Sequence, residues 1–263
     1  MPKIAIYRPT SLPGYMQVVQ TLQRQARHPL WFRGNGRLNH KLVPTLYRHK
    51  KIPTMGGFGI LERQLMARFR QRSMPYHSRD LRDDWEALFF MQHYGVPTRL
   101  LDWTENPLVA LHFALMFSRG ASSRPSPSIV WVLDPFAWNR TALAHVSYNG
   151  GPLTTEDEDL KGYAPKTATM GIYPVALYGA HNSPRIVAQQ GVFTILGANK
   201  NPMEKLVTKG LFPPRSLAAI VVSAMRVRHM RQSLLEQGMT ETVVFPDLEG
   251  LAKETKRFFG FEA

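Results

Sequence analysis

Apolar residues recur at every third or fourth position in several stretches of the chain, which is the spacing of one face of an α-helix. The pattern predicts helices over residues 15–27, 58–72, 83–93, 226–237 and 248–259. A further helix is expected beyond a turn, where Thr104 is placed to cap it and Pro107 suits its first turn. Helices therefore dominate the first half of the chain.

Short runs of β-branched and aromatic residues, bounded by Gly, Pro or Asp, predict the strands. The first begins at Leu30, and the others span residues 128–133, 185–187, 191–196, 217–222 and 241–245. This order of elements favours an α+β fold over regular βαβ winding. Since no repeat or long linker interrupts the chain, we expect one domain over residues 1–263, helical to about residue 120 and strand-rich from about residue 121.

The composition excludes several classes of protein. The chain has 263 residues, of which 44% are hydrophobic, so it is long and apolar enough to bury a core. It contains no cysteine, which rules out disulfides, iron–sulfur clusters, thiolate zinc sites and cysteine nucleophiles. The longest nearly unbroken apolar run, Leu217 to Met225, is far shorter than the roughly 20 residues that span a bilayer. We therefore expect a cytoplasmic protein without a membrane partner.

Positive charge is the strongest compositional signal. The formal net charge is +14 and the sequence pI is about 10.2. Ten Lys and Arg residues precede the first acidic residue, Glu62, and ten more lie within residues 161–231 against Glu204 alone. A surface this positive attracts polyanions. It predicts a nucleic acid as the partner, and RNA in preference to DNA. The alternatives are that the charge binds an acidic inhibitory protein of the antitoxin kind, or that it only keeps the protein soluble.

Several common catalytic and cofactor motifs are absent from the sequence. It has no GxxxxGK[ST] loop, no GxSxG and no HExxH. Gly34-Asn35-Gly36 lacks the third glycine of GxGxxG, because Asn39 stands there. The nine histidines have no ligand spacing, so no metal site is predicted.

Three polar segments remain as candidates for a site. The first is Trp31 to Gly34, in which an arginine follows two bulky aromatic residues and precedes a glycine. The Arg33 guanidinium can grip a phosphate as a fork, and Gly34 allows a ligand to approach the backbone closely. The alternative interpretation is a surface arginine at the end of a strand.

The second segment, residues 92–107, packs polar residues into a turn between two very apolar helices. Buried polar groups need partners, so the turn is either an internal network, with Arg99 and Asp102 as an ion pair, or a ligand site. Glu86 and His93 are seven residues apart on the preceding helix and therefore share one face.

The third segment, residues 182–193, has Gln189 and Gln190 directly before Gly191 at the start of a strand. By composition alone it is a turn. Because apolar stretches flank the polar ones, we expect Arg33 and residues 92–106 to converge on one pocket.

Together these segments resemble the FRG domain family, which is named for the (F/Y)RG motif seen here as Phe32-Arg33-Gly34. The resemblance continues in order through QHYGVPTRLLDWTENPLVALHFA, SIVWVLDP, PRIVAQQGVF and VVFPDLEG, over residues 92–114, 128–135, 184–193 and 243–250. It spans nearly the whole chain, and its first block is long and specific.

The order of parts also resembles the ADP-ribosyltransferase fold, which implies a split mixed β-sheet with NAD as a substrate. In that fold an Arg-Gly strand contacts NAD, and a turn with Ser or Thr leads into an apolar helix. Residues 102–104, before the helical residues 110–114, match this order. The resemblance therefore assigns Arg33 and Gly34 to NAD binding. It assigns Thr104 to the second part of the pattern, the Ser or Thr in the turn before the helix.

The chain departs from this fold where the transferases carry a catalytic Glu. It has Ser183-Pro184-Arg185 there, and no carboxylate lies between residues 161 and 200. The catalytic candidates are Glu86 and Asp102 as acids and His93 as a base or ribose contact. The residues expected to bind NAD are Arg33, Gly34, Tyr94, Thr98, Arg99, Thr104, Asn106, Gln189 and Gln190.

The leading hypothesis from the sequence is an NAD-dependent ADP-ribosyltransferase that modifies nucleic acid, as a toxin or a phage-defence effector. One alternative is an NAD hydrolase or a transferase that acts on protein. The other is a non-catalytic module that binds a nucleotide or RNA, which the missing Glu favours.

Overall fold

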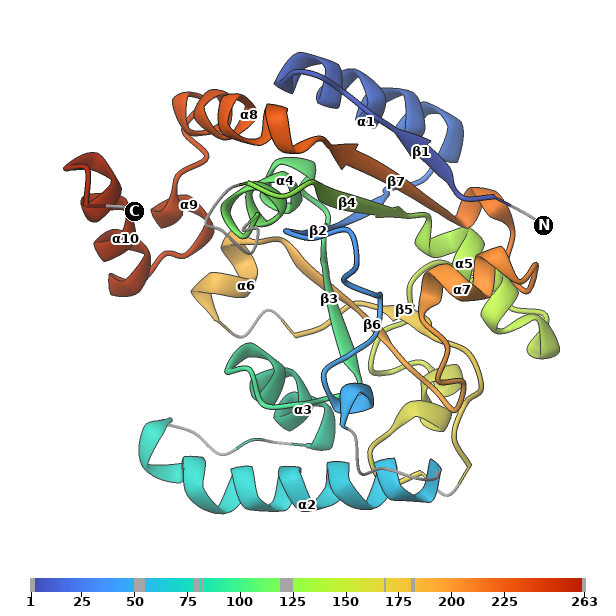
Figure 1. Cartoon of the computed structure of the whole chain (residues 1–263). Coiled ribbons are helices and arrows are strands. Elements are labelled where there is room, and N and C mark those ends of the chain that lie inside the picture. Colours follow the sequence, from blue (N-terminus) through green and yellow to red (C-terminus); the bar gives the residue numbers. More distant parts are fainter. Residues whose placement is uncertain are drawn as a thin grey trace.

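The computed structural model describes residues 3–49, 55–77, 81, 83–118, 125–167, 169–180 and 183–261. In these residues, seven strands form one mixed sheet with the order β1-β7-β4-β2-β3-β6-β5 (Figure 1). Their bounds are β1 Ala5–Tyr7, β2 Trp31–Asn35, β3 Leu100–Thr104, β4 Ser128–Leu133, β5 Val175–Leu177, β6 Gly191–Ile195 and β7 Leu217–Val222. The fold class is α+β, as the sequence predicts. Strands from before residue 120 (β1, β2 and β3) and strands from after it are interleaved in the sheet.

The sheet consists of two halves that meet weakly at β2 and β3. Only the pair Phe32–Thr104 joins these two strands, whereas five pairs join β2 to β4 and five join β3 to β6. Figure 1 shows β4 and β7 lying across the direction of β3 and β6. This bend leaves the ends of β2, β3 and β6 beside one another within the single mixed sheet.

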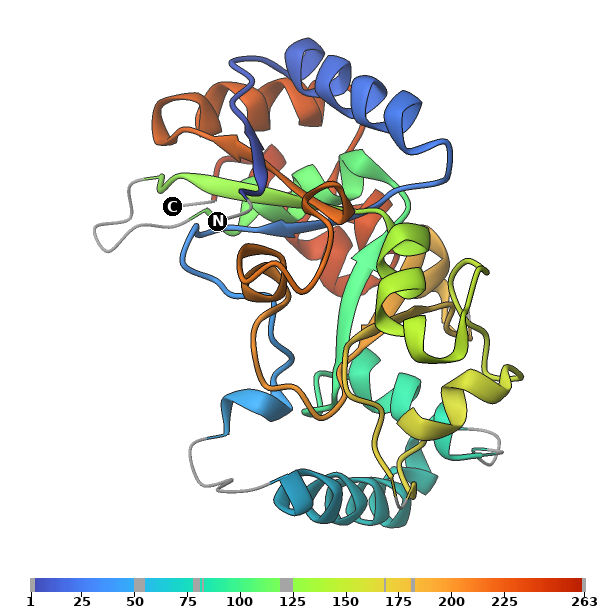
Figure 2. The ribbon, with the colours of Figure 1, turned by 90° about the vertical axis from the view of Figure 1, so that its right-hand side faces the viewer.

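Helices cover both faces of the β1-β7-β4-β2 half. The bounds of all the described α-helices, on this half and elsewhere, are α1 Leu12–Ala26, α2 Met55–Ser73, α3 Asp84–His93, α4 Pro107–Met116, α5 Pro135–Ala142, α6 Pro184–Ala188, α7 Met203–Thr208, α8 Ala224–Glu236, α9 Glu241–Val244 and α10 Leu248–Phe258. Short 3-10 turns are η1 Leu46–Arg48, η2 Met74–Tyr76, η3 Ala144–Val146, η4 Glu158–Tyr163 and η5 Pro214–Ser216. Figure 2 shows α1 and α8 at one end of the molecule and α2 at the other.

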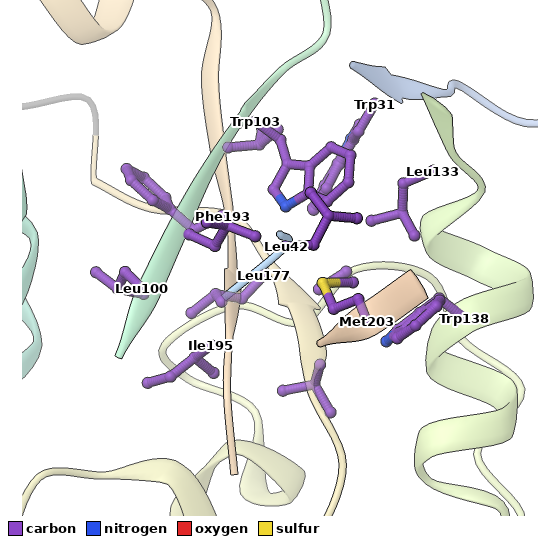
Figure 3. Close-up of a cluster of buried hydrophobic side chains, with 14 of the residues drawn as sticks. Trp31, Leu42, Leu100, Trp103, Leu133, Trp138, Leu177, Phe193, Ile195 and Met203 are labelled. Carbon is purple, nitrogen blue, oxygen red and sulfur yellow. The ribbon is translucent and has the colours of Figure 1, made fainter. Parts of the chain in front are cut away.

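The central strands bury alternate residues on opposite faces, as strand geometry requires. In β4, Val130 and Val132 join the cluster under α1, α4 and α8, while Trp131 joins the larger cluster on the other face. Because both faces are covered, these strands appear in the sequence as continuous apolar runs. Figure 3 shows the larger cluster, which includes Trp103 of β3, Phe193 of β6 and Met203.

Several short elements differ from the prediction. Residues 185–187 are not a strand but belong to α6, because Ser183 caps a helix and Pro184 occupies its first position. Residues 241–245 contain α9 instead of a strand, and residues 100–104, expected in a turn, form β3. The cap of α4 is Asn106 and not Thr104, since the Asn106 Oδ1 accepts from two backbone amides of the first turn.

No helix among the described residues is long and apolar enough to cross a membrane. The same part of the chain contains no group of three or more His, Asp or Glu side chains placed to hold a metal ion.

Candidate functional site

A cavity of about 220 Å³ lies where the two halves of the sheet meet. Its lining comes from three strands, β2, β3 and the start of β6, and from three helices, the last turn of α3 and the first turns of α4 and α6. The polar residues of the lining are Arg33, Gln92, His93, Asp102, Thr104, Arg185 and Gln189. The structure thus brings Arg33 together with both ends of the segment 92–106, through Gln92 and His93 of α3 and residues 102–104 of β3.

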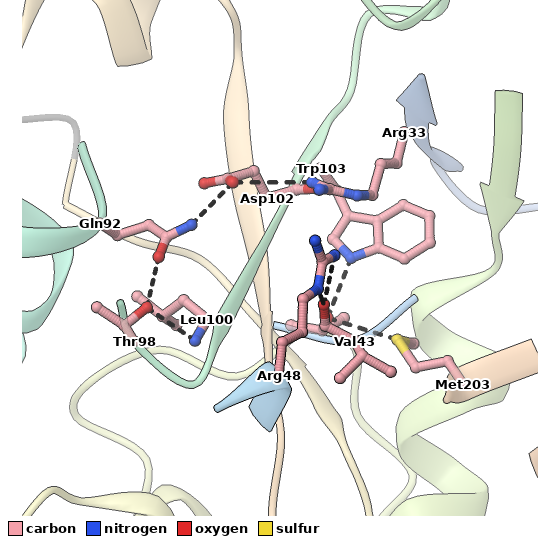
Figure 4. Close-up of polar contacts among 10 residues, drawn as sticks. Arg33, Val43, Arg48, Gln92, Thr98, Leu100, Asp102, Trp103 and Met203 are labelled. Carbon is pink, nitrogen blue, oxygen red and sulfur yellow. Dashed lines mark hydrogen bonds and ion pairs between the residues drawn. The ribbon is translucent and has the colours of Figure 1, made fainter. Parts of the chain in front are cut away.

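Arg33 reaches the cavity from β2, between the two halves of the sheet. Its Nη1 donates to the backbone carbonyl of Asp102 at 2.5 Å and lies 3.7 Å from the Asp102 carboxylate (Figure 4). Burial lowers the pKa of the guanidinium, Asp102 raises it, and the positive charge of Arg48 lowers it further. An arginine keeps its proton in spite of such shifts, so the site holds a partly desolvated permanent cation.

A chain of hydrogen bonds fixes the carboxylate of Asp102. The Leu100 amide donates to the Thr98 hydroxyl, which in turn donates to Gln92 Oε1. The other end of that amide, Gln92 Nε2, donates to Asp102 Oδ2 at 2.8 Å (Figure 4). Each group in this chain has its donor and acceptor roles set by the one before it. The Asp102 side chain is nevertheless 54% exposed, so a fixed carboxylate faces the open site.

A second cation, Arg185, enters the cavity from the first turn of α6. Its guanidinium lies over the ring of Phe245, 4.6 Å from the ring centroid. Such a contact holds the planar group in place while leaving its N–H donors directed away from the ring. Sequence reasoning noted Arg185 only as a departure from the transferase pattern. The cap signal of Ser183-Pro184 would have placed it at a helix start.

His93 stands between the two charges of the site. Burial and Arg185 lower the pKa of its imidazole, while Asp102 and Asp247 raise it. The net direction is downward, so the ring is neutral at pH 7 and one ring nitrogen is an acceptor. The Ser183 hydroxyl lies 3.5 Å from Nδ1.

Gly34 has a packing role that the sequence analysis did not foresee. A Cβ built at this position would lie 1.8 Å from the Ala110 carbonyl oxygen and 2.7 Å from the Ala114 amide nitrogen, both in α4. The glycine therefore lets β2 lie directly against the backbone of α4. It also lines the cavity, but the backbone that approaches it most closely belongs to the protein itself.

Thr104 and Gln189 join β3 to the turn before β6. The Thr104 hydroxyl donates to the Gln189 carbonyl at 2.5 Å and accepts from the Asn106 amide at 3.0 Å. Gln189 Nε2 donates to the Val244 carbonyl at 3.0 Å. Both line the cavity, yet these polar groups already hold its walls together. Gln190, with a φ of 46°, does not line the cavity formed by the described residues.

Arg99 corrects the ion pair proposed from the sequence. Its side chain is fully buried and pairs with Glu62 of α2 at 2.9 Å, not with Asp102. Arg99 also donates to the carbonyls of Tyr163 and Leu196. Removing one partner of such a buried pair leaves an unmatched charge, so Arg99 joins α2 to the sheet and does not bind a ligand.

Other predicted residues also lie apart from the lining of the cavity, as far as the described chain shows. Glu86 is buried on α3, Thr98 is buried within the hydrogen-bond chain, and Asn106 caps α4. Tyr94 is 63% exposed and packs edge-on against Phe90 and His93. Of the two acids considered for catalysis, the structure places Asp102 in the cavity and Glu86 outside it.

A comparison with protein families matches the part of the chain that contains most of this cavity. The family model of the FRG domain matches residues 28–122, just over a third of the chain. This span includes β2, α3, β3 and α4, and with them most of the cavity. These residues are therefore similar to the FRG domain, the family that the motifs of the sequence resemble. No curated protein and no solved structure matches it.

Proposed function

We propose that this protein is an NAD-dependent ADP-ribosyltransferase whose acceptor is a nucleic acid, RNA in preference to DNA. The observation that carries the proposal is a fixed, half-exposed carboxylate, Asp102, in one cavity with two guanidinium groups, Arg33 and Arg185. The diphosphate of NAD matches the two cations. A ribosyl carbon that becomes positive in the transition state matches the carboxylate.

The residues then divide the reaction between them. The bond between nicotinamide and the ribose C1′ breaks, its electron pair leaves with the nicotinamide, and the acceptor forms a new bond to C1′. Both described contacts of the Asp102 carboxylate use Oδ2, which leaves Oδ1 to stabilise the developing positive charge. His93, kept neutral by its lowered pKa, accepts the proton that the acceptor loses.

The chemistry supports a role as a toxin or a phage-defence effector in the cytoplasm. Modification of RNA would stop growth of the cell that makes the enzyme, so such a protein needs a partner that restrains it. A chain of formal net charge +14 offers an acidic inhibitor a complementary surface.

A non-catalytic nucleotide-binding module is the second candidate, and two observations favour it. The Thr104 hydroxyl is already bound to Gln189 and Asn106. The segment where the transferases carry a glutamate has Ser183, Pro184 and Arg185, none of which is a carboxylate. Under this reading the site binds NAD or a related dinucleotide without breaking it.

The deciding experiment is incubation of the protein with NAD labelled in the adenylate part, together with RNA, DNA or a protein mixture. We expect label on RNA. We expect Asp102→Asn to lower the rate by about 10²-fold or more, the loss typical of one electrostatic contact to a transition state, with NAD binding retained. Glu86→Gln is the matched control and should leave the rate unchanged.

Three results would contradict the proposal in different ways. Binding of NAD without any transfer supports the second candidate. Label that appears only on protein, or only as free ADP-ribose, gives the wrong acceptor. An Asp102→Asn protein that is fully active removes Asp102 from the chemistry.

A further inference from the structure

A second cavity, of about 270 Å³, lies in the segment that follows β2. It is lined by Asn39, His40, Lys41, Val43 and Arg48. All of these except Val43 are exposed, so the cavity opens to solvent and presents two cationic side chains, Lys41 and Arg48. The family resemblance assigns no role to these residues.

Backbone and side-chain hydrogen bonds hold this segment in one shape. Asn35 Nδ2 donates to the His40 carbonyl at 3.4 Å, and the Leu42 amide donates to the Glu204 carboxylate at 3.1 Å. Arg48 donates from Nε and Nη2 to the Val43 carbonyl, at 3.1 and 2.8 Å (Figure 4). The guanidinium is thus oriented before any ligand arrives, which reduces the entropy lost on binding.

Positive charge is concentrated between this cavity and the first one. Burial lowers the pKa of the His40 imidazole, and the charges of Arg48, Arg37 and Arg33 lower it further. Arg48 likewise lowers the pKa of Arg33. No carboxylate of the described residues is among the groups that shift His40.

The nearby carboxylates already face other cations. Asp102 lies beside Arg33, and Glu204 faces Lys41 and Lys205, which lower its pKa against the effect of burial. The charges of Arg37 and Arg48 therefore repel a proton on the imidazole of His40, which lines this open cavity. An anion that bound there would relieve this repulsion.

We propose that the second cavity binds the phosphodiester backbone of a single-stranded nucleic acid, one nucleotide of which enters the first cavity. The assignment rests on the proposed function, because that function requires an acceptor at the mouth of the first cavity. A nucleic acid carries a phosphate next to every nucleoside, so a nucleotide that enters the first cavity brings a phosphate with it. An acidic protein would need a suitably placed carboxylate by chance.

Arg33 connects the two cavities, since it lines the first and its charge acts on His40 in the second. The arrangement also explains why the neighbouring sequence is free of acidic residues up to Glu62. A carboxylate in this segment would neutralise the phosphate site.

The test is binding of a fluorescein-labelled single-stranded RNA, measured by anisotropy over a series of salt concentrations and without NAD. For Arg37→Gln and for Arg48→Gln we expect weaker binding and a shallower salt dependence. The slope of log K against log salt should change by about 0.7 for each lost contact to a single strand. Arg24→Gln, the same change at an exposed arginine on α1, should leave both quantities as they are in the parent protein.

A second measurement does not depend on how the variants fold. The pKa of His40, followed by NMR of its ring protons in the unchanged protein, should rise when the RNA is added, because bound phosphate favours the charged imidazole. A His40→Gln protein identifies the resonance.

The proposal is overturned if the parent protein does not bind RNA, if Arg24→Gln weakens binding as much as Arg48→Gln, or if the pKa of His40 stays constant. It is also overturned if a polyglutamate peptide competes as well as RNA, which would indicate an acidic protein partner. RNA binding that depends on Arg37 and Arg48 without any transfer of ADP-ribose would support the second cavity and remove only the proposed reaction.

Discussion

Arg33 donates a hydrogen bond to the Asp102 backbone and lies near its carboxylate, so part of its donor capacity is used before a ligand binds. A guanidinium has five N–H donors in a rigid plane and can bind a phosphate at the same time. A lysine has one compact ammonium group on a flexible stem and cannot hold both partners in one plane. The chemistry of this site therefore depends on an arginine in particular.

Replacing Arg33 by Lys should weaken NAD binding by roughly tenfold to a hundredfold, the effect of losing one charge-assisted hydrogen bond of about 1.5–3 kcal/mol. The melting temperature should fall by only about 2–4 °C, because the lost contact within the protein is worth about 1 kcal/mol. Calorimetric titration with NAD and a thermal melt measure the two effects. A large fall in melting temperature with unchanged NAD affinity would show that Arg33 is structural.

At the scale of elements, long amphipathic stretches were predictable and short segments were not. Helices α1, α2, α3, α8 and α10 lie within three residues of their predicted bounds, and β4 and β7 match theirs. The elements that were missed or mistaken are β1, β3, β5, α5, α6, α7 and α9. Each has three to eight residues, too few to distinguish a period of 2 from a period of 3.6. Their structure is decided by caps and by pairing with distant strands.

The contact of β2 with α4 gives a prediction at this scale. Gly34→Ala should destabilise the protein by about 1–3 kcal/mol or more, since its Cβ would overlap the Ala110 carbonyl oxygen and backbone would have to move. Gly59→Ala in α2 is the matched control, because the nearest atom to its Cβ is the Arg63 Nη1 at 3.8 Å. That change should stabilise the protein by about 0.5–1 kcal/mol through helix propensity.

Urea unfolding of the two variants measures both changes. The packing role assigned to Gly34 would be wrong if the two alanines had the same effect on the free energy of unfolding. A Gly34→Ala protein that folds normally but no longer binds NAD would instead restore the role predicted from the sequence, in which the glycine makes room for a ligand.

At the scale of the whole molecule, the sequence predicted that polar segments would gather but not which charges would pair. Arg33 and Asp102 meet at the cavity. Arg99, by contrast, pairs with Glu62, a residue 37 positions earlier, on α2. Arg185 reaches the site because α6 and Phe245 hold it there. Such pairs depend on how helices pack across the sheet, and local spacing contains no information about this packing.

The packing of helices on the sheet also makes stability depend on pH, through His112 of α4. Its side chain is buried, and Nδ1 lies 3.2 Å from the Met239 carbonyl, which requires a proton on Nδ1. Burial lowers the pKa of the imidazole, and the charges of Arg231 and Arg257 lower it further. The Met239 carbonyl and Glu241 raise this pKa, but burial outweighs them. The folded state therefore holds this histidine in its neutral form.

The sign of the pH effect follows from this lowered pKa. As the pH falls below about 6.5, the ordinary value, the unfolded chain takes up a proton at His112 that the folded chain does not. Stability is therefore fully present above that pH and decreases down to the folded-state pKa, by about 1.4 kcal/mol for each unit between the two values.

In His112→Asn, the amide nitrogen occupies the position of Nδ1 and can still donate to Met239. We expect the free energy of unfolding, measured in urea between pH 7.5 and 5, to fall less in His112→Asn than in the parent protein. Parallel curves for the two proteins would show that His112 titrates alike in the folded and unfolded states.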